Sequence, residues 1–122
     1  MEIEFDPFFR ILAAPMPSTH LIVLCTVPDG VVADRIAQTV IEERLAACVN
    51  RIPGVSSIFH WHGKVQHEDE VLLLMKTVTQ AFPALEARIR TLHPNTVPEI
   101  IAVQIAAGSA PYLDWITENT TP

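Results

Sequence analysis

The sequence predicts an α+β fold in which two helices cover one face of an antiparallel sheet. Three observations predict it: a chain of 122 residues, an apolar content of 49%, and strand-forming runs that alternate with two segments of helical periodicity. A chain of this length suits one domain with one core. Charged residues make up only 18% of the chain, against roughly 25% in a typical soluble domain. We therefore expect an apolar surface that is covered in an oligomer.

The first strand is expected at residues 20–27, which are β-branched and apolar without strict alternation. Such a run is typical of a central strand that is covered on both faces. Asp29 then supplies a helix N-cap. Apolar residues from Ala33 to Ile41 recur at intervals of 3, 1, 3 and 1, which puts them on one helical face. We expect the first helix over residues 30–46.

A long β-hairpin is predicted for the middle of the chain, residues 48–77. Its first strand bends at Pro53-Gly54 and ends at Trp61. His62-Gly63 supplies a tight turn. The apolar run within residues 70–77 forms the returning strand, which is expected to pair with the first.

The second helix is expected to open at about residue 79 and to end near His93, because Pro94 disfavours a helical conformation in the residue before it. Four apolar residues within this helix are spaced 3, 4 and 3 and form one stripe. A fourth strand is predicted over residues 98–107. A short third helix follows, with Ser109 as its N-cap.

The predicted order is β-α-β-β-α-β followed by a helix, which is the ferredoxin-like arrangement. Right-handed crossovers place both main helices on one face of the four-stranded antiparallel sheet. The other face has no helix of its own, so apolar residues there need a partner, which again favours an oligomer. We assign this single domain to residues 20–119. Residues 1–19, which three prolines interrupt, are predicted to form a flexible tail.

Charge and hydropathy exclude two classes of partner. The chain has 8 basic and 14 acidic residues, a net charge of −6, whereas a nucleic-acid binder needs a basic surface. No apolar run approaches the roughly 20 residues of a membrane helix, and an acidic chain is not attracted to an anionic membrane surface. We therefore expect neither nucleic acid nor a membrane as a partner.

The N-terminus and the cysteines predict a cytoplasmic location. Glu2, Glu4 and Asp6 stand where a secretory signal would carry positive charge. Cys25 and Cys48 are too few for a disulfide framework. We therefore expect both to be free thiols in a reducing compartment.

Six segments between about residues 23 and 116 resemble those of a known family. They read VLCTVPD (23–29), EERLAACVNRIPGVSSIF (42–59), WHGK (61–64), LLMKT (73–77), LHPNTVPEI (92–100) and GSAPYLDW (108–115). In this order and spacing they resemble the CutA family, the divalent-cation tolerance proteins. The resemblance covers nearly all of the chain that is predicted to be ordered, which makes it specific.

The resemblance implies a ferredoxin-like homotrimer in which hairpins extend across neighbouring subunits and close exposed sheet edges. It implies tolerance to copper and other divalent cations such as zinc, without established reaction chemistry. It assigns metal ligation to Cys25 in the first strand and to His93 ahead of the proline after the second helix. Four positions depart from the family pattern. Leu92 stands where some members have a further histidine, Asn95 where tyrosine is common, and His60 and His62 where tyrosine and glutamate are expected around the hairpin tryptophan.

Each candidate ligand also has a structural interpretation. A free cysteine is usually a buried apolar side chain, and a thiol with a pKa of about 8.5 binds metal only when the metal displaces its proton. Cu(I) is soft enough to do so. His93, at a helix C-terminus, can instead stabilise the helix dipole as an imidazolium. Cys25 and His93 are two ligands where a closed site needs about four, so the others would come from a neighbouring subunit, Cys48 or water.

A second candidate metal site is specific to this sequence and flanks the hairpin tryptophan. His60 and His62 are i and i+2 on a strand, so their side chains share a face. A two-residue turn adds His67 to that face, whereas a three-residue turn puts it on the other. Three imidazoles would suit Cu(II), Ni(II) or Zn(II). The alternative is that all three are solvated hairpin residues.

Further positions typical of the family are candidates for a cleft or a subunit interface: Trp61, Lys64, Glu70, Lys76, Glu99 and Trp115. Lys76 and Glu99 are candidates for a charge pair, because a covered charge needs a partner. The four glycines form no phosphate-binding loop, and no Ser-His-Asp arrangement or oriented Cys-His pair is indicated. We therefore expect a metal-binding protein and not an enzyme.

Two alternatives stand beside the metal-binding trimer. One is a signalling module that binds a small molecule in clefts between subunits, as the similarly folded PII regulators do. The short hairpin turn and the presence of only two lysines, Lys64 and Lys76, make a PII-like nucleotide site the weaker interpretation. The other alternative is a scaffold whose function is stable assembly, with any metal incidental.

Overall fold

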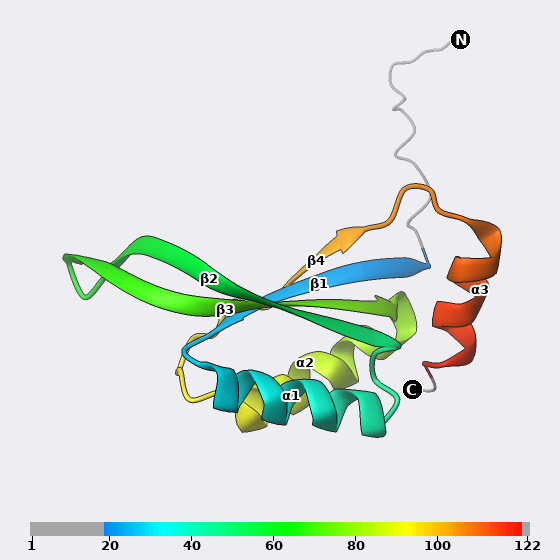
Figure 1. The fold of residues 1–122 in the computed structure, drawn as a ribbon, viewed down its shortest axis with the longest axis horizontal. Coiled ribbons are helices and arrows are strands. Elements are labelled where there is room, and N and C mark those ends of the chain that lie inside the picture. Colours follow the sequence, from blue (N-terminus) through cyan, green and yellow to red (C-terminus); the bar gives the residue numbers. More distant parts are fainter. Residues whose placement is uncertain (1–18, 121–122) are drawn as a thin grey trace, which may run out of the picture.

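The computed structural model describes residues 19–120. Its elements are β1 (His20–Val27), α1 (Gly30–Glu42), β2 (Cys48–Trp61), β3 (Lys64–Val78), a 3₁₀ turn (Thr79–Ala81), α2 (Phe82–Leu92), β4 (Ile101–Gln104) and α3 (Ala110–Glu118). The four strands form one antiparallel sheet in the order β2-β3-β1-β4, and α1 and α2 cover one of its faces (Figure 1). The predicted ferredoxin-like α+β fold is confirmed. The predicted tail lies almost wholly outside the described residues.

The side chains of β1 alternate between the two faces of the sheet. Leu21, Val23, Cys25 and Val27 are buried against the helices, and the residues between them are half-buried on the opposite face. The sequence predicted that β1 is covered on both faces. Within a single chain only the face toward the helices is fully covered. The second face is apolar but lies away from α1 and α2 (Figure 1).

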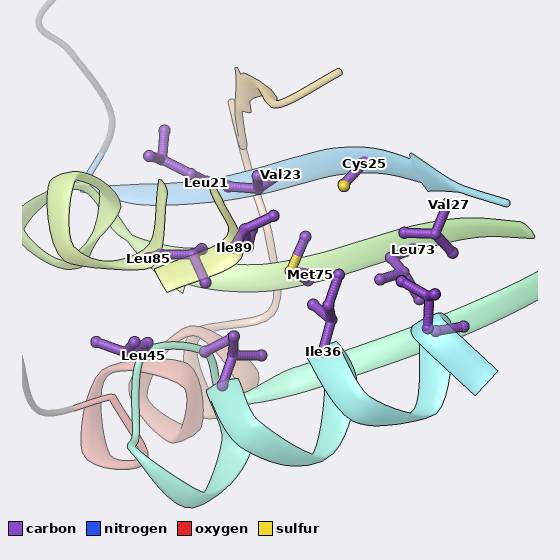
Figure 2. Packing of buried hydrophobic residues seen from close by; sticks show 14 residues of the cluster. Leu21, Val23, Cys25, Val27, Ile36, Leu45, Leu73, Met75, Leu85 and Ile89 are labelled. Carbon is purple, nitrogen blue, oxygen red and sulfur yellow. The ribbon is translucent and has the colours of Figure 1, made fainter. Parts of the chain in front are cut away.

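The hydrophobic core lies between the sheet and the two main helices (Figure 2). α1 contributes Ile36 and Val40, and α2 contributes Leu85 and Ile89, all fully buried. These four residues belong to the apolar stripes predicted from the helical spacing. Close packing of these stripes against β1 and β3 fixes the helices over one face of the sheet.

α1 is shorter than predicted, because it ends at Glu42 and not at residue 46. Its start is as predicted: Asp29 Oδ1 accepts a hydrogen bond of 2.9 Å from the backbone N–H of Val32. At its end Arg44 adopts a left-handed φ of 58°, which turns the chain out of the helix. The backbone N–H of Ala47 then donates to the carbonyl of Lys76 at 2.8 Å, which leads the chain into β2.

The returning strand of the hairpin is longer than predicted, because β3 begins at Lys64 and not at residue 70. His62 and Gly63 both have positive φ, 51° and 77°, as a two-residue type I′ turn requires. The resulting register pairs Trp61 with Lys64 and His60 with Val65. The distal half of the hairpin projects well beyond the helices (Figure 1).

β4 is shorter than predicted and covers Ile101–Gln104 instead of residues 98–107. Pro98 has no N–H to donate to a ladder. After β4 the chain leaves the sheet and leads into α3, which packs against the ends of β1 and β3. The register places Ile101 and Val103 on the face away from the main helices, where they are 52% and 51% exposed.

Candidate functional site

The sheet face away from α1 and α2, called the open face below, is rich in apolar side chains. The strand register brings six of them together, two from each of β1, β3 and β4: Ile22, Leu24, Leu72, Leu74, Ile101 and Val103. Exposed apolar patches of this kind mark interaction sites in soluble proteins. The open face is therefore the strongest candidate for a contact between subunits.

Cys25 lies in the hydrophobic core on the helix side of β1, and its side chain is fully buried (Figure 2). Its thiol is 3.8 Å from the carbonyl oxygen of Thr26. Burial raises the pKa of the Cys25 thiol to about 12, and the negative charges of Glu99 and Glu70 raise it further in the same direction. At neutral pH the thiol is therefore protonated, and a metal must displace that proton.

His93 is 7% exposed, and both of its ring nitrogens form hydrogen bonds to the backbone. Nε2 lies 2.8 Å from the carbonyl oxygen of Thr26, and Nδ1 accepts from the backbone N–H of Asn95 at 3.1 Å. A carbonyl only accepts and an N–H only donates, so the ring is neutral with its proton on Nε2. His93 joins the end of β1 to the loop after α2, and its imidazole does not cap the helix as an imidazolium.

Cys25 and His93 are thus brought to the same end of β1. The Nε2 of His93 contacts the carbonyl of Thr26, which is the residue next to Cys25. Neither candidate presents a free metal-ligating atom in this conformation, because the thiol is protonated and both imidazole nitrogens are hydrogen-bonded. Metal ligation by this pair requires a proton to leave and a hydrogen bond to break.

The three hairpin histidines do not form the predicted three-ligand group within one chain. His60 and His67 share a face, because their register partners are Val65 and Ile58. His62 occupies the turn, where its left-handed φ removes it from strand alternation, and its ring lies edge-on to that of Trp61 at 4.9 Å. Across residues 19–120, no three His, Cys, Asp or Glu side chains lie in an arrangement that could hold a metal ion.

Lys76 and Glu99 do not form the predicted charge pair. Lys76 Nζ donates to the Oδ1 atom of Asn50 at 2.6 Å, across the β2–β3 ladder on the open face. Glu99 lies in the loop before β4. The two lie apart along the sheet, because Lys76 is opposite Ile22 near the start of β1, whereas Glu99 lies near Thr26 at the end of that strand.

Trp115 and Lys64, two other predicted cleft or interface residues, lie apart from one another. Trp115 is on α3 and stacks on Tyr112 with ring centroids 5.5 Å apart. Lys64 opens β3 opposite Trp61 at the hairpin tip. Of the predicted set, Trp61, Glu70 and Glu99 are the ones that come together.

Those three residues line a cavity of about 770 Å³ between the distal hairpin, the end of β1 and the loop from Pro94 to Glu99. Phe59 and Glu68 also line it, and the sequence predictions missed both. Phe59 could have been predicted from the alternation of side chains along β2, because it lies on the same strand face as Trp61. Glu68 lies opposite Ser57 in the hairpin register, and the sequence of either strand alone does not predict that pairing.

Comparison with known proteins decides the family. A family model described as CutA1 divalent ion tolerance protein matches residues 21–119. The chain belongs to this family. Its CutA relatives include the divalent-cation tolerance protein of Thermus thermophilus, which is 57% identical over 99 residues, covering 81% of this chain and 96% of that protein. The human protein named CutA is 42% identical over 105 residues, covering 86% of this chain but 59% of the human protein.

The fold of this CutA chain also matches solved structures. The structure of the Thermus thermophilus divalent cation tolerance protein superimposes with a TM-score of 0.82 at 55% identity, covering 84% of this chain and 99% of that one. The predicted family is confirmed, and its description names tolerance of divalent ions. Among the helices of residues 19–120, none has the length and apolar character needed to cross a membrane.

Proposed function

We propose that this chain acts in divalent-cation tolerance as a cytoplasmic homotrimer that binds metal ions, copper in particular, and catalyses no reaction. The observation that carries the proposal is the match of residues 21–119 to the CutA1 divalent ion tolerance family. His93 contacts the carbonyl oxygen of Thr26, the residue that follows Cys25 in β1. This contact supports a metal ion shared by Cys25 and His93. Both cysteines are free thiols, which suits a reducing compartment.

The trimer is supported by the open face. A protein of this size that leaves six apolar side chains of one sheet face without a helix above them gains stability when copies of the chain cover one another. The projecting hairpin offers unpaired strand edges that a neighbouring chain can use. A neighbouring chain would also supply the additional ligands that a two-residue site lacks.

Copper suits this site better than zinc, for a chemical reason. The thiol of Cys25 is protonated and buried, so binding there favours a metal with a strong preference for thiolate sulfur, which displaces the proton. Cu(I) has that preference, because it is a soft ion. Binding would release the thiol proton and free one nitrogen of His93 from its backbone partner.

Anaerobic titration with Cu(I) against a competing chelator tests the metal site. Because the pKa of Cys25 is about 12, one proton leaves for each ion bound, and the apparent affinity is expected to rise about tenfold per pH unit between pH 6 and 8. Cys25→Ser is expected to weaken binding by more than the roughly 10- to 100-fold that loss of an outer-shell partner causes. His93→Gln is expected to weaken it less.

Cys48→Ser is the matched control for the copper titration, because it removes the half-buried thiol of β2 and leaves the core thiol in place. It is expected to keep the affinity and the pH dependence of the wild-type protein. Copper binding that survives Cys25→Ser, or that does not change with pH, would contradict the proposed ligand.

A small-molecule signalling module is the second candidate function. The observation that favours it is the cavity of about 770 Å³, which lies within the roughly 300–1,000 Å³ range of ligand pockets. Its lining contains no lysine, arginine or histidine. A PII-like nucleotide site needs basic groups for the phosphates, so the charge of this cavity disfavours a nucleotide.

A further inference from the structure

We infer that residues 1–18, called the N-terminal segment below, dock on the helices of their own chain, with phenylalanine side chains in a groove between α2 and the turn after α1. The groove has a volume of about 350 Å³ and is lined by Glu43, Leu45, Ala84, Ala87, Arg88 and Thr91. Since α2 lies on the opposite side of the sheet from the open face (Figure 1), subunit contacts through the open face leave this groove accessible.

The floor of the groove is apolar. Ala84, Ala87 and Thr91 are spaced 3 and 4 along α2 and therefore share one helical face. Leu45, in the turn after α1, lies beside them and is 8% exposed. Three of these four side chains have no polar atom, so the floor favours an apolar occupant.

The charges at the rim of the groove neutralise one another. Arg88 Nη2 lies 3.0 Å from Glu43 Oε2, and Arg88 Nη1 donates to Thr91 Oγ1 at 3.1 Å. The guanidinium therefore has partners within the chain, and an anionic ligand would have to compete with them. An apolar side chain can enter without disturbing these contacts.

The N-terminal segment joins the domain at the end of the sheet where the groove lies. The carbonyl of Thr19 accepts a hydrogen bond of 2.9 Å from the backbone N–H of Thr79, which opens the 3₁₀ turn that leads into α2. The carbonyl of Leu45, in the groove, accepts from Thr77 Oγ1 at 2.7 Å. Both contacts are made at the same end of β3.

The length of the segment is sufficient for its phenylalanines to reach the groove. Ten residues separate Phe9 from Thr19 and span up to about 34 Å when extended. The part of α2 that lines the groove runs from Ala84 to Thr91, which is about 11 Å of helix. The whole groove therefore lies within reach.

The composition of the segment matches the apolar floor. Three of the five phenylalanines of the chain, Phe5, Phe8 and Phe9, lie in it, followed by Ile11 and Leu12. A covalently attached segment also acts at an effective concentration of about millimolar, an advantage that a separate partner lacks. These two properties favour the segment of the same chain as the occupant.

Limited digestion of the full chain with trypsin tests the inference. Arg10 is the only lysine or arginine within residues 1–18, so release of residues 1–10, measured by mass spectrometry, reports on the segment alone. Docking is expected to make this cleavage at least about tenfold slower than in a synthetic peptide of residues 1–18, as partial burial of one phenylalanine implies.

Two kinds of variant are expected to remove the protection. Ala87→Arg places a charged side chain in the groove and is expected to accelerate cleavage about tenfold. The double variant Phe5→Ser, Phe8→Ser is expected to do the same when its rate is compared with that of a peptide carrying both serines. Both serines lie outside the hydrophobic core of residues 19–120, so this variant keeps the fold even if Ala87→Arg disturbs it.

Gln38→Arg is the matched control, because Gln38 is exposed on α1 and does not line the groove; it is expected to keep the wild-type cleavage rate. Three results would overturn the inference: wild-type cleavage as fast as that of the peptide, equal rates in Ala87→Arg and Gln38→Arg, or unchanged protection in the double serine variant. Cleavage is measured without metal, so its outcome is independent of the copper proposal.

Discussion

Leu74→Arg is expected to reduce the native particle from three chains to one. Leu74 lies near the centre of the open face, with Leu24 of β1 on one side and Asn50 of β2 on the other. If this face is covered by neighbouring chains, each copy of the variant buries a guanidinium without a partner, which costs several kcal/mol per charge. Size-exclusion chromatography with light scattering measures the change in mass.

Ala87→Arg is the control for this variant. Ala87 is exposed on α2, on the opposite side of the sheet from the open face. It adds the same charge and is expected to leave the assembly intact. A Leu74→Arg protein that keeps the mass of its parent would show that the open face is not a subunit contact.

Alkaline pH is expected to destabilise the wild-type protein through Cys25. The pKa of this thiol is about 12 in the folded protein, against 9.0 as its ordinary value. Between pH 9 and pH 12 the unfolded chain loses the thiol proton and the folded chain keeps it, so stability falls as pH rises. The expected loss is about 1.4 kcal/mol per pH unit, or about 4 kcal/mol over the full interval.

Urea unfolding under reducing conditions measures this loss at fixed protein concentration. Cys25→Ala is expected to be less stable at pH 7, because it leaves a small cavity in the core, but to lack the additional alkaline slope. Cys48→Ala is expected to retain it. Identical alkaline slopes in the wild-type protein and in Cys25→Ala would contradict the assigned pKa.

Local patterns predicted the elements of this fold well, and long-range pairing accounts for what they missed. The stripes that include Ile36 and Leu85 identified the two main helices, because one face of each is buried. Helix α1 ends early, at Glu42, and the chain turns at Arg44 with a left-handed φ, which a glycine in the sequence would have indicated but an arginine does not. Residues 64–69 are mostly polar, yet they join β3 because the turn at Gly63 aligns them with β2.

For the candidate sites, too, the sequence identified residues, whereas their contacts depend on the folded chain. Trp61, Glu70 and Glu99, three of the six candidates for a cleft or an interface, lie around one cavity of the single chain. The proposed ligands Cys25 and His93 were named from the resemblance to the CutA family, but the burial of the Cys25 thiol and the backbone partners of the His93 ring are provided only by the folded chain. The same holds for Lys76, whose partner is an amide and not the predicted carboxylate.

The mass of the wild-type particle in solution tests the central claim most directly, namely that the open face is shared among copies of this chain. Light scattering over a dilution series is expected to give about 40 kDa, three times the 13.5 kDa of one chain. A particle of 13.5 kDa at every concentration would contradict it, because the apolar face of the sheet would then be stable in water without a partner.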